Sequence, residues 1–173
     1  MKRVYFLTGA FLAIHSVVGI GQPSCISFTS SNSAFSIVSG RKAAPILLSS
    51  DDWPGVHLAA SNFAADINRV SGIKPAFRNI TSPSQASGTP PIIVGTLGKS
   101  SLIDQIVNAT QLDVSSISGK WEAYLSREVK NPLPGVQKAY VIIGADKRGT
   151  IYALYDHSEQ IGGHVVDYRR CRG

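Results

Sequence analysis

The clearest pattern in the sequence is a stripe of apolar positions between residues 56 and 70. Its members recur at the three- and four-residue spacing of one face of an α-helix. They are Val56, Ala59, Ala60, Phe63, Ala64, Ile67 and Val70. Pro54 suits a first helical turn, where its missing N–H would have no partner, and Gly72 suits a helix end. The pattern predicts a helix whose small side chains allow close packing on a sheet.

Short apolar runs bounded by Gly, Pro and Ser predict strands on both sides of that helix. Two further helices follow from the apolar positions Leu102, Ile103 and Ile106 and from a helical stretch that stops at Gly162. The predicted strands are 34–38, 45–48, 74–80, 92–95, 121–129 and 139–144, and the predicted helices are 56–70, one opening after residues 98–101, and 150–161.

The order of these elements is β-β-α-β-β-α-β-β-α, without an internal repeat. Such alternation is typical of an α/β or α+β fold, here with helices on one face of a single mixed β-sheet. The chain has 173 residues, of which 43% are hydrophobic, and this length is enough for one domain with a core of its own.

Residues 1–21 have the pattern of a secretory signal peptide. Lys2 and Arg3 give a charged start, the stretch 4–14 is mostly apolar, and small residues precede Gln22. A membrane anchor is the alternative, but the apolar run is interrupted and shorter than the roughly 20 residues of a spanning helix. We expect a cleaved signal and a secreted, extracellular mature chain without a membrane partner.

Two N-glycosylation triplets agree with export. They begin at Asn79 and Asn108, both near predicted element ends. Cys25 and Cys171 lie near the two ends of the mature chain, and the sequence leaves open whether they pair. Two cysteines are too few for a disulfide-rich scaffold or a four-cysteine zinc site.

The net charge of +6 comes mostly from the two ends of the chain. Removal of Lys2 and Arg3 lowers it to +4, and residues 163–173 hold three arginines and one aspartate, so residues 22–162 carry only +2. The basic pI of about 9.5 therefore does not indicate a nucleic-acid partner. A stripe of basic residues interleaved with aromatic ones, which single-stranded nucleic acid would require, is also missing from the sequence.

Several patterns that suggest catalysis or cofactor binding are incomplete. Only Thr96 and Leu97 separate Gly95 from Gly98, too few for a phosphate-binding loop, so the Gly-Lys-Ser segment is read as a strand-to-helix turn with Ser100 near the cap. The sequence contains no nucleophile elbow and no metal-ligand spacing of histidines. We therefore predict no cofactor and no metal.

Histidines and carboxylates have structural interpretations. His57 falls beside the apolar stripe of the first helix and is read as a packing residue. His157 has acidic neighbours in the third helix and is placed on its solvated face. Glu122 and Glu128 share one predicted strand, too far apart for the paired carboxylates of a glycosidase.

Two loop segments carry the remaining candidate residues for capping or an interface. Asp51 and Asp52, before Trp53, can cap the free amides at the start of the first helix. In the segment Asp146, Lys147, Arg148, Gly149, the aspartate caps the last helix and the arginine grips a neighbouring domain or an anionic group. We favour capping with an interface over ligand binding.

Three segments of the chain resemble a known family. They are 45–56, 142–152 and 155–162, and the resemblance extends from about residue 34 to residue 162. The segments are similar to the amino-terminal domain of glycoside hydrolase family 115, whose members are xylan α-1,2-glucuronidases. Arg148-Gly149 followed by Tyr152 also resembles a pattern that opens the last helix in the accessory domain of hexosaminidase-like enzymes. The resemblance implies that accessory-domain fold, of the domain 2 type.

The resemblance stops abruptly at Gly162. In the family a catalytic (β/α) barrel follows, whereas residues 163–173 depart from the family's aromatic continuation, so no catalytic residue can be transferred to this chain. A one-base shift in the codons for 165–171 would permit part of that continuation. We interpret 163–173 as a divergent tail that is out of frame, through a gene-model error, a splice variant or a frameshift.

These observations lead to an expected domain order: signal peptide 1–21, Ser-rich leader 22–33, accessory domain 34–162 and the tail. We expect a truncated, non-catalytic, amino-terminal part of a secreted hydrolase that, at full length, removes glucuronic or 4-O-methylglucuronic acid from xylan. Its partner would be the catalytic barrel. The alternative is a stand-alone secreted carbohydrate-binding or interaction module with xylan as ligand, although the sequence shows no row of exposed aromatic residues.

Overall fold

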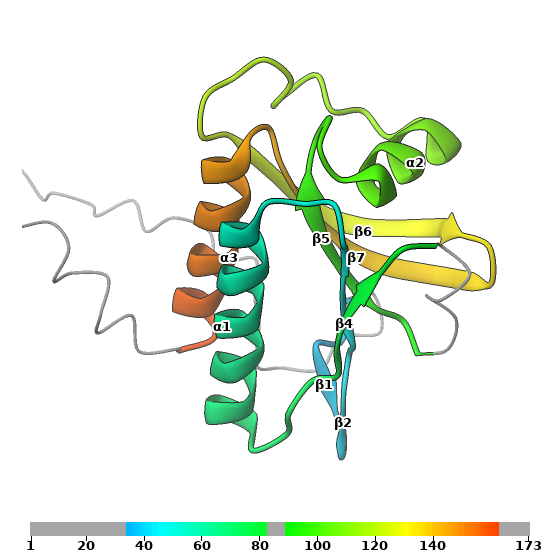
Figure 1. Ribbon diagram of the computed structural model, residues 1–173. Helices are drawn as coiled ribbons and strands as arrows, with labels where there is room; N and C mark the ends of the chain where they lie inside the picture. Colours follow the sequence, from blue (N-terminus) through cyan, green and yellow to red (C-terminus); the bar gives the residue numbers. More distant parts are fainter. Residues whose placement is uncertain (1–33, 83–88, 163–173) are drawn as a thin grey trace, which may run out of the picture.

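The computed structural model describes residues 34–82 and 89–162 (Figure 1). The predicted signal peptide, leader and tail, with Cys25 and Cys171, lie outside these residues. The elements are β1 (Val38–Ser39), β2 (Lys42–Ala43), β3 (Ile46–Ser49), α1 (Pro54–Ser71), β4 (Phe77–Ile80), β5 (Ile92–Thr96), α2 (Ser101–Thr110), β6 (Tyr124–Leu133), β7 (Val136–Gly144) and α3 (Lys147–Gln160).

A five-stranded mixed sheet in the order β4-β3-β5-β7-β6 is the centre of the fold. Strands β4, β3, β5 and β7 run parallel, and only β6 is antiparallel, because a tight turn joins it to β7. β1 and β2 form a separate antiparallel pair around Gly40. The mixed α/β fold expected from the sequence is confirmed.

Helices cover both faces of this sheet. Ile46 and Leu48 of β3 point into a core that they share with α1 and α3, whereas Leu47 belongs to a second core with α2. Figure 1 shows α1 and α3 side by side, with α2 on the other side of the strands. The expectation of helices on one face was therefore wrong. The continuous apolar runs of β3, β5 and β7 are the reason, since strands buried on both faces lose the alternation of a half-exposed strand.

Element boundaries differ from the prediction in the first strand and around the β6–β7 hairpin. The strand predicted at 34–38 is the short β1, Val38–Ser39, which pairs with an unpredicted β2. β6 begins only at Tyr124, because Glu122 adopts a left-handed backbone conformation with φ of 57°. It continues to Leu133, beyond the predicted end of the strand at Val129. α1 ends as predicted, with Gly72 in the left-handed conformation. Within the described ranges, no helix combines the length and the apolar character that a bilayer crossing requires.

Candidate functional site

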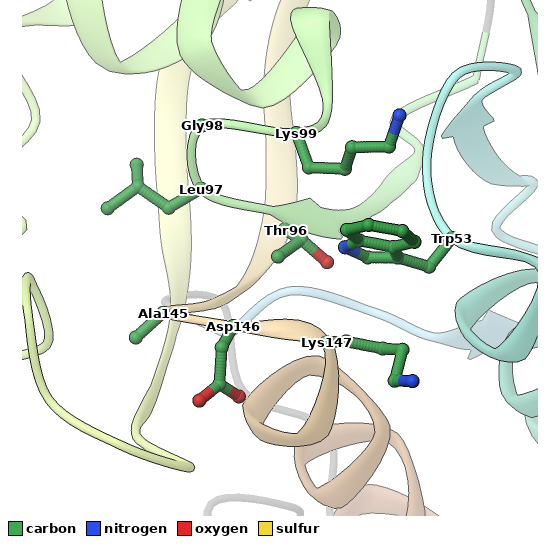
Figure 2. Close-up of a pocket in the computed structure, with 8 residues that line it drawn as sticks. All are labelled: Trp53, Thr96, Leu97, Gly98, Lys99, Ala145, Asp146 and Lys147. Carbon is green, nitrogen blue, oxygen red and sulfur yellow. The ribbon is translucent and has the colours of Figure 1, made fainter.

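The parallel strands β3, β5 and β7 end at one edge of the sheet, which we call the carboxyl edge. Each strand continues through a short loop into a helix, so that three loops and three helix starts meet there. These loops surround an open cavity of about 410 Å³ (Figure 2). Its lining residues are Trp53, Thr96, Leu97, Gly98, Lys99, Ala145, Asp146 and Lys147.

Asp52 ties the β3–α1 loop to the neighbouring strand. Its side chain is only 5% exposed; Oδ2 accepts the Thr96 N–H at 2.8 Å and Oδ1 accepts the Trp53 N–H at 2.7 Å. The helix-capping role predicted for Asp51 and Asp52 was wrong, because Trp53 is the N-cap of α1 and no side chain caps it. The loop instead turns the Asp52 carboxylate sideways toward β5, where it satisfies a buried backbone donor.

Asp51 plays a similar part at the start of α2. Its Oδ2 accepts the Ser101 N–H at 3.3 Å, and Ser49 and Ser101 are joined through their hydroxyl groups at 3.0 Å. Its slight burial would raise the pKa, but hydrogen bonds from these two serines outweigh burial and hold the pKa of Asp51 below its ordinary value. Both aspartates of the loop are thus engaged by neighbouring segments.

Two strand-end glycines let the helices begin close to the sheet. A Cβ added to Gly95 would lie 2.6 Å from side-chain atoms of Ile103 and Ser100, and one added to Gly144 would lie 2.1 Å from the Thr150 backbone nitrogen. Above these glycines the Oγ1 atoms of Thr96 and Thr150 are 2.9 Å apart and buried. Of these four residues, Thr96 lines the cavity.

Asp146 stands at the N-cap of α3 and uses both carboxylate oxygens. Oδ1 accepts the Gly149 N–H at 2.7 Å and Oδ2 accepts the Glu122 N–H at 3.0 Å. Burial alone would raise the pKa of Asp146, but these amides and the nearby Arg148 hold it below its ordinary value. The carboxylate is therefore a structural acceptor that links α3 to the loop before β6.

Arg148 and Gly149 strengthen the same link. Arg148 Nη1 donates to Glu122 Oε1 at 2.8 Å, so the arginine pairs with its own chain. The Ala123 carbonyl oxygen would lie 2.3 Å from a Cβ on Gly149, and the Ala145 N–H donates to that oxygen at 2.8 Å. Only glycine permits this close approach. Within the described residues this segment therefore makes an internal contact, and its interface with a neighbouring domain stays a prediction.

The cavity is lined by Trp53, Lys99 and Lys147 on one side. Figure 2 shows both lysine side chains extending on the same side as the indole ring, whereas the Asp146 carboxylate points away from it. The Lys99 Nζ lies 5.1 Å from the centre of the Trp53 ring, within the range of a cation–π contact. Trp53 remains 42% exposed. Sequence reasoning singled out Trp53 and Lys147 but read Lys99 only as part of a turn.

His157 is the residue whose predicted place was most wrong. It was assigned to a solvated helix face, yet its exposed fraction is 0%. Its Nδ1 lies 2.7 Å from the Ala153 carbonyl oxygen and its Nε2 lies 3.0 Å from the Tyr140 hydroxyl. The helix face that carries His157 packs on the sheet beside α1, where Phe63 meets the imidazole edge-on.

The glycosylation candidates are both exposed and lie apart. Asn79 is in β4, where its Oδ1 is 3.0 Å from His57 Nδ1, and Asn108 is near the end of α2. His57 is half-buried and pairs with Asn79 rather than packing into the core. Glycosylation at either asparagine stays a prediction.

The cavity offers groups for binding rather than an acid–base pair. Of its eight lining residues only Asp146 is acidic, and both of its oxygens already accept backbone hydrogen bonds. Elsewhere Glu122 pairs with Arg148, and Glu128 pairs with Lys138 at 3.3 Å. No cluster of metal-ligating side chains occurs among the residues that the structure describes.

Comparison with known proteins shows a likeness at the level of the fold. No family model matches the chain, and no curated protein matches it. Among solved structures, the chain is similar to a family GH115 4-O-methyl-α-glucuronidase with specificity for decorated arabinogalactans, with a TM-score of 0.52 and 22% sequence identity. The match covers 70% of this chain and 14% of that enzyme. It shows a fold shared with a small part of a much longer protein.

Proposed function

We propose that this chain carries the non-catalytic, amino-terminal accessory domain of a secreted glycoside hydrolase related to family 115. In full-length form such an enzyme would remove glucuronic or 4-O-methylglucuronic acid side chains from xylan. The observation that carries the proposal is the likeness of 70% of this chain to 14% of a solved GH115 glucuronidase. The resemblance of segments 45–56, 142–152 and 155–162 supports it, because they form β3, the start of α1, the end of β7 and α3, which lie together in the fold.

The side chains at the carboxyl edge support a non-catalytic role. Glycosidases commonly place two carboxyl groups about 5–9.5 Å apart on either side of the scissile bond. At this edge Asp51, Asp52 and Asp146 each accept backbone N–H groups. They stabilise the loops, and a carboxylate used in this way is a poor general acid or nucleophile. The catalytic groups would belong to the barrel domain, which is the proposed partner.

An activity assay tests the non-catalytic role. The purified chain, incubated with glucuronoxylan, is expected to release no glucuronic acid, and an established α-glucuronidase on the same substrate is the positive control. Release above the level of a heat-denatured sample would contradict the proposal. The nucleotide sequence after the codon for Gly162 provides a second test: a frame that encodes a hydrolase barrel supports the proposed partner, and its absence from every frame contradicts it.

A stand-alone carbohydrate-binding module is the second candidate, and the structure adds one observation in its favour. Trp53 is 42% exposed and Trp121 is 82% exposed. Trp121 precedes β6, whose Tyr124 pairs with the last residue of β7, so both tryptophans lie toward the carboxyl edge. Saturable retention of the chain on insoluble xylan, lost in Trp53→Ala and Trp121→Ala, would favour this candidate. Equal retention of both variants would exclude these rings as the binding surface.

A further inference from the structure

The cavity lies where the connections of neighbouring parallel strands diverge. β5 continues into α2 on one face of the sheet, whereas β3 and β7, on either side of β5, continue into α1 and α3 on the opposite face. Diverging loops leave a crevice beyond the carboxyl ends of the strands, and open α/β sheets bind ligands in such crevices. The cavity of about 410 Å³ is lined by residues of all three loops and is within the usual size range of small-ligand sites.

The basic side chains of this crevice are two lysines. Lys99 and Lys147 line it, and neither takes part in the three ion pairs found among the described residues. Three carboxylates at or beside the lining accept backbone N–H groups instead: Asp146 from Gly149 and Glu122, Asp52 from Trp53 and Thr96, and Asp104 from Gly98. Ser100 and Asp146 already cap α2 and α3, so the lysines rather than the helix ends supply the charge for a ligand.

A ring and a short apolar wall accompany the charge. Trp53 is 42% exposed, and its indole lies under the Lys99 ammonium at 5.1 Å, which keeps the cation beside an aromatic surface. Leu97 and Ala145 add apolar surface on the other loops. A ligand suited to this lining combines a negative charge with a compact ring that has both apolar C–H and polar groups.

We propose that the carboxyl-edge cavity binds an anionic sugar unit, with its carboxylate or phosphate between Lys99 and Lys147 and its ring against Trp53. The anionic part rests on the two lysines, which take part in no ion pair among the described residues. The sugar part rests on the proposed function, which makes this chain part of a carbohydrate-active protein. The site would give the accessory domain a ligand of its own, separate from any catalytic centre.

The two tryptophans of the sequence allow a direct optical test. In a Trp121→Phe variant Trp53 is the only tryptophan, so its fluorescence reports on the cavity. This variant would be titrated at low salt with glucuronate, glucose 6-phosphate, glucose, inorganic phosphate and ADP. We expect saturable fluorescence changes with at least one of the two sugar anions. Glucose should bind at least about tenfold more weakly than that anion. Added salt should weaken binding, because an exposed charge is screened within about 10 Å at 0.1 M.

Lysine variants in the same background test the assigned contacts. Lys99→Ala and Lys147→Ala should each weaken the sugar anion by about three- to tenfold, as expected for a partly exposed charge-assisted contact. Lys130→Ala is the matched control: it removes the same charge from an exposed position near the β6–β7 turn, at the opposite end of the hairpin from the cavity. Its affinity should equal that of the parent. Thermal unfolding of each variant separates a binding defect from loss of fold.

Several results would overturn the proposal. They are the absence of saturation with both sugar anions, equal affinity for glucose, unchanged affinity in both cavity lysine variants, and tighter binding of phosphate or ADP than of either sugar anion. Failure of this binding proposal is distinguishable from failure of the proposed function. Release of glucuronic acid by the chain would contradict the non-catalytic role whether or not the cavity binds, whereas failure of these titrations leaves the xylan assay unaffected.

Discussion

At the scale of single residues, His157 shows how far tertiary contacts can separate a side chain from its sequence neighbours. Asp156 and Glu159 flank it in the chain, yet the imidazole is fully buried. The Ala153 carbonyl can only accept, so Nδ1 carries the proton, and the neutral ring's Nε2 accepts the Tyr140 hydroxyl. Burial lowers the pKa of His157, which favours the neutral form of the ring.

The stability of the fold should depend on pH through this residue. Burial lowers the pKa of His157, against smaller opposing effects of Ala153 and Asp156. Because the unfolded chain keeps a histidine pKa near 6.5, it binds the proton first as the pH falls. The contribution of His157 is thus present above about pH 6.5 and is lost progressively below it. We expect a lower urea midpoint at pH 5 than at pH 7.

A His157→Gln variant provides the contrast, since the amide can still hydrogen-bond but cannot titrate. Its midpoint should change less between pH 7 and pH 5 than that of the parent. His57→Gln is the control, because His57 is only half-buried and pairs with Asn79 near the surface. Identical pH dependence in the parent and His157→Gln would rule out this residue as the cause.

At the scale of elements, the start of α3 is held against the loop before β6 by several short contacts. Asp146 accepts from both Gly149 and Glu122, and Ala123 approaches Gly149 too closely for any side chain. Glu122 adopts a left-handed φ of 57°, which a non-glycine residue keeps only when its neighbours demand it. The helix start and the loop therefore depend on one another.

Two glycine-to-alanine substitutions separate this close approach from helix propensity. Gly149→Ala would place a Cβ 2.3 Å from the Ala123 carbonyl oxygen, and we expect it to lower the free energy of unfolding by about 1–3 kcal/mol. Gly55→Ala, in the first turn of α1, meets only Ile151 Cδ1 at 3.4 Å, an ordinary contact. It should be neutral or stabilising by up to about 1 kcal/mol.

Chemical unfolding of both variants and the parent measures the two effects. If Gly149→Ala had the same free energy of unfolding as Gly55→Ala, the loop before β6 would have to shift away from the added Cβ without cost. That result would contradict the interdependence argued here. A loss confined to Gly149→Ala would show that the contact of α3 with Ala123 outweighs the gain in helix propensity.

At the scale of the whole molecule, the proposed export lowers the net charge of the protein. The net charge of +6 includes Lys2 and Arg3, which a signal peptide would remove. We expect the exported protein to begin at Gln22 and to carry +4. Intact-mass measurement and amino-terminal sequencing of protein recovered from the culture medium would check this. Recovery of chains that still begin at Met1, or only inside cells, would contradict the proposal.

The sequence by itself determined most of the elements and the fold class. A 3.6-residue period, Pro54 and Gly72 are local signals, and they sufficed for α1; the same holds for the apolar runs of β3, β5 and β7. The capping role of Asp146 at the start of α3 could also be predicted from the sequence, because a cap acts within a single turn. Such features depend on a few neighbouring residues, so they can be predicted from the sequence alone.

Only the tertiary structure decided which segments meet. It placed α2 on the opposite face from α1 and α3, directed Asp52 to the Thr96 amide, and buried His157 beneath Tyr140. It also brought Trp53, Lys99 and Lys147 from three loops to one cavity. Each of these outcomes depends on the order of strands in the sheet and on the face to which each connection crosses. Contacts between residues far apart in the chain set that order, and no local pattern encodes it.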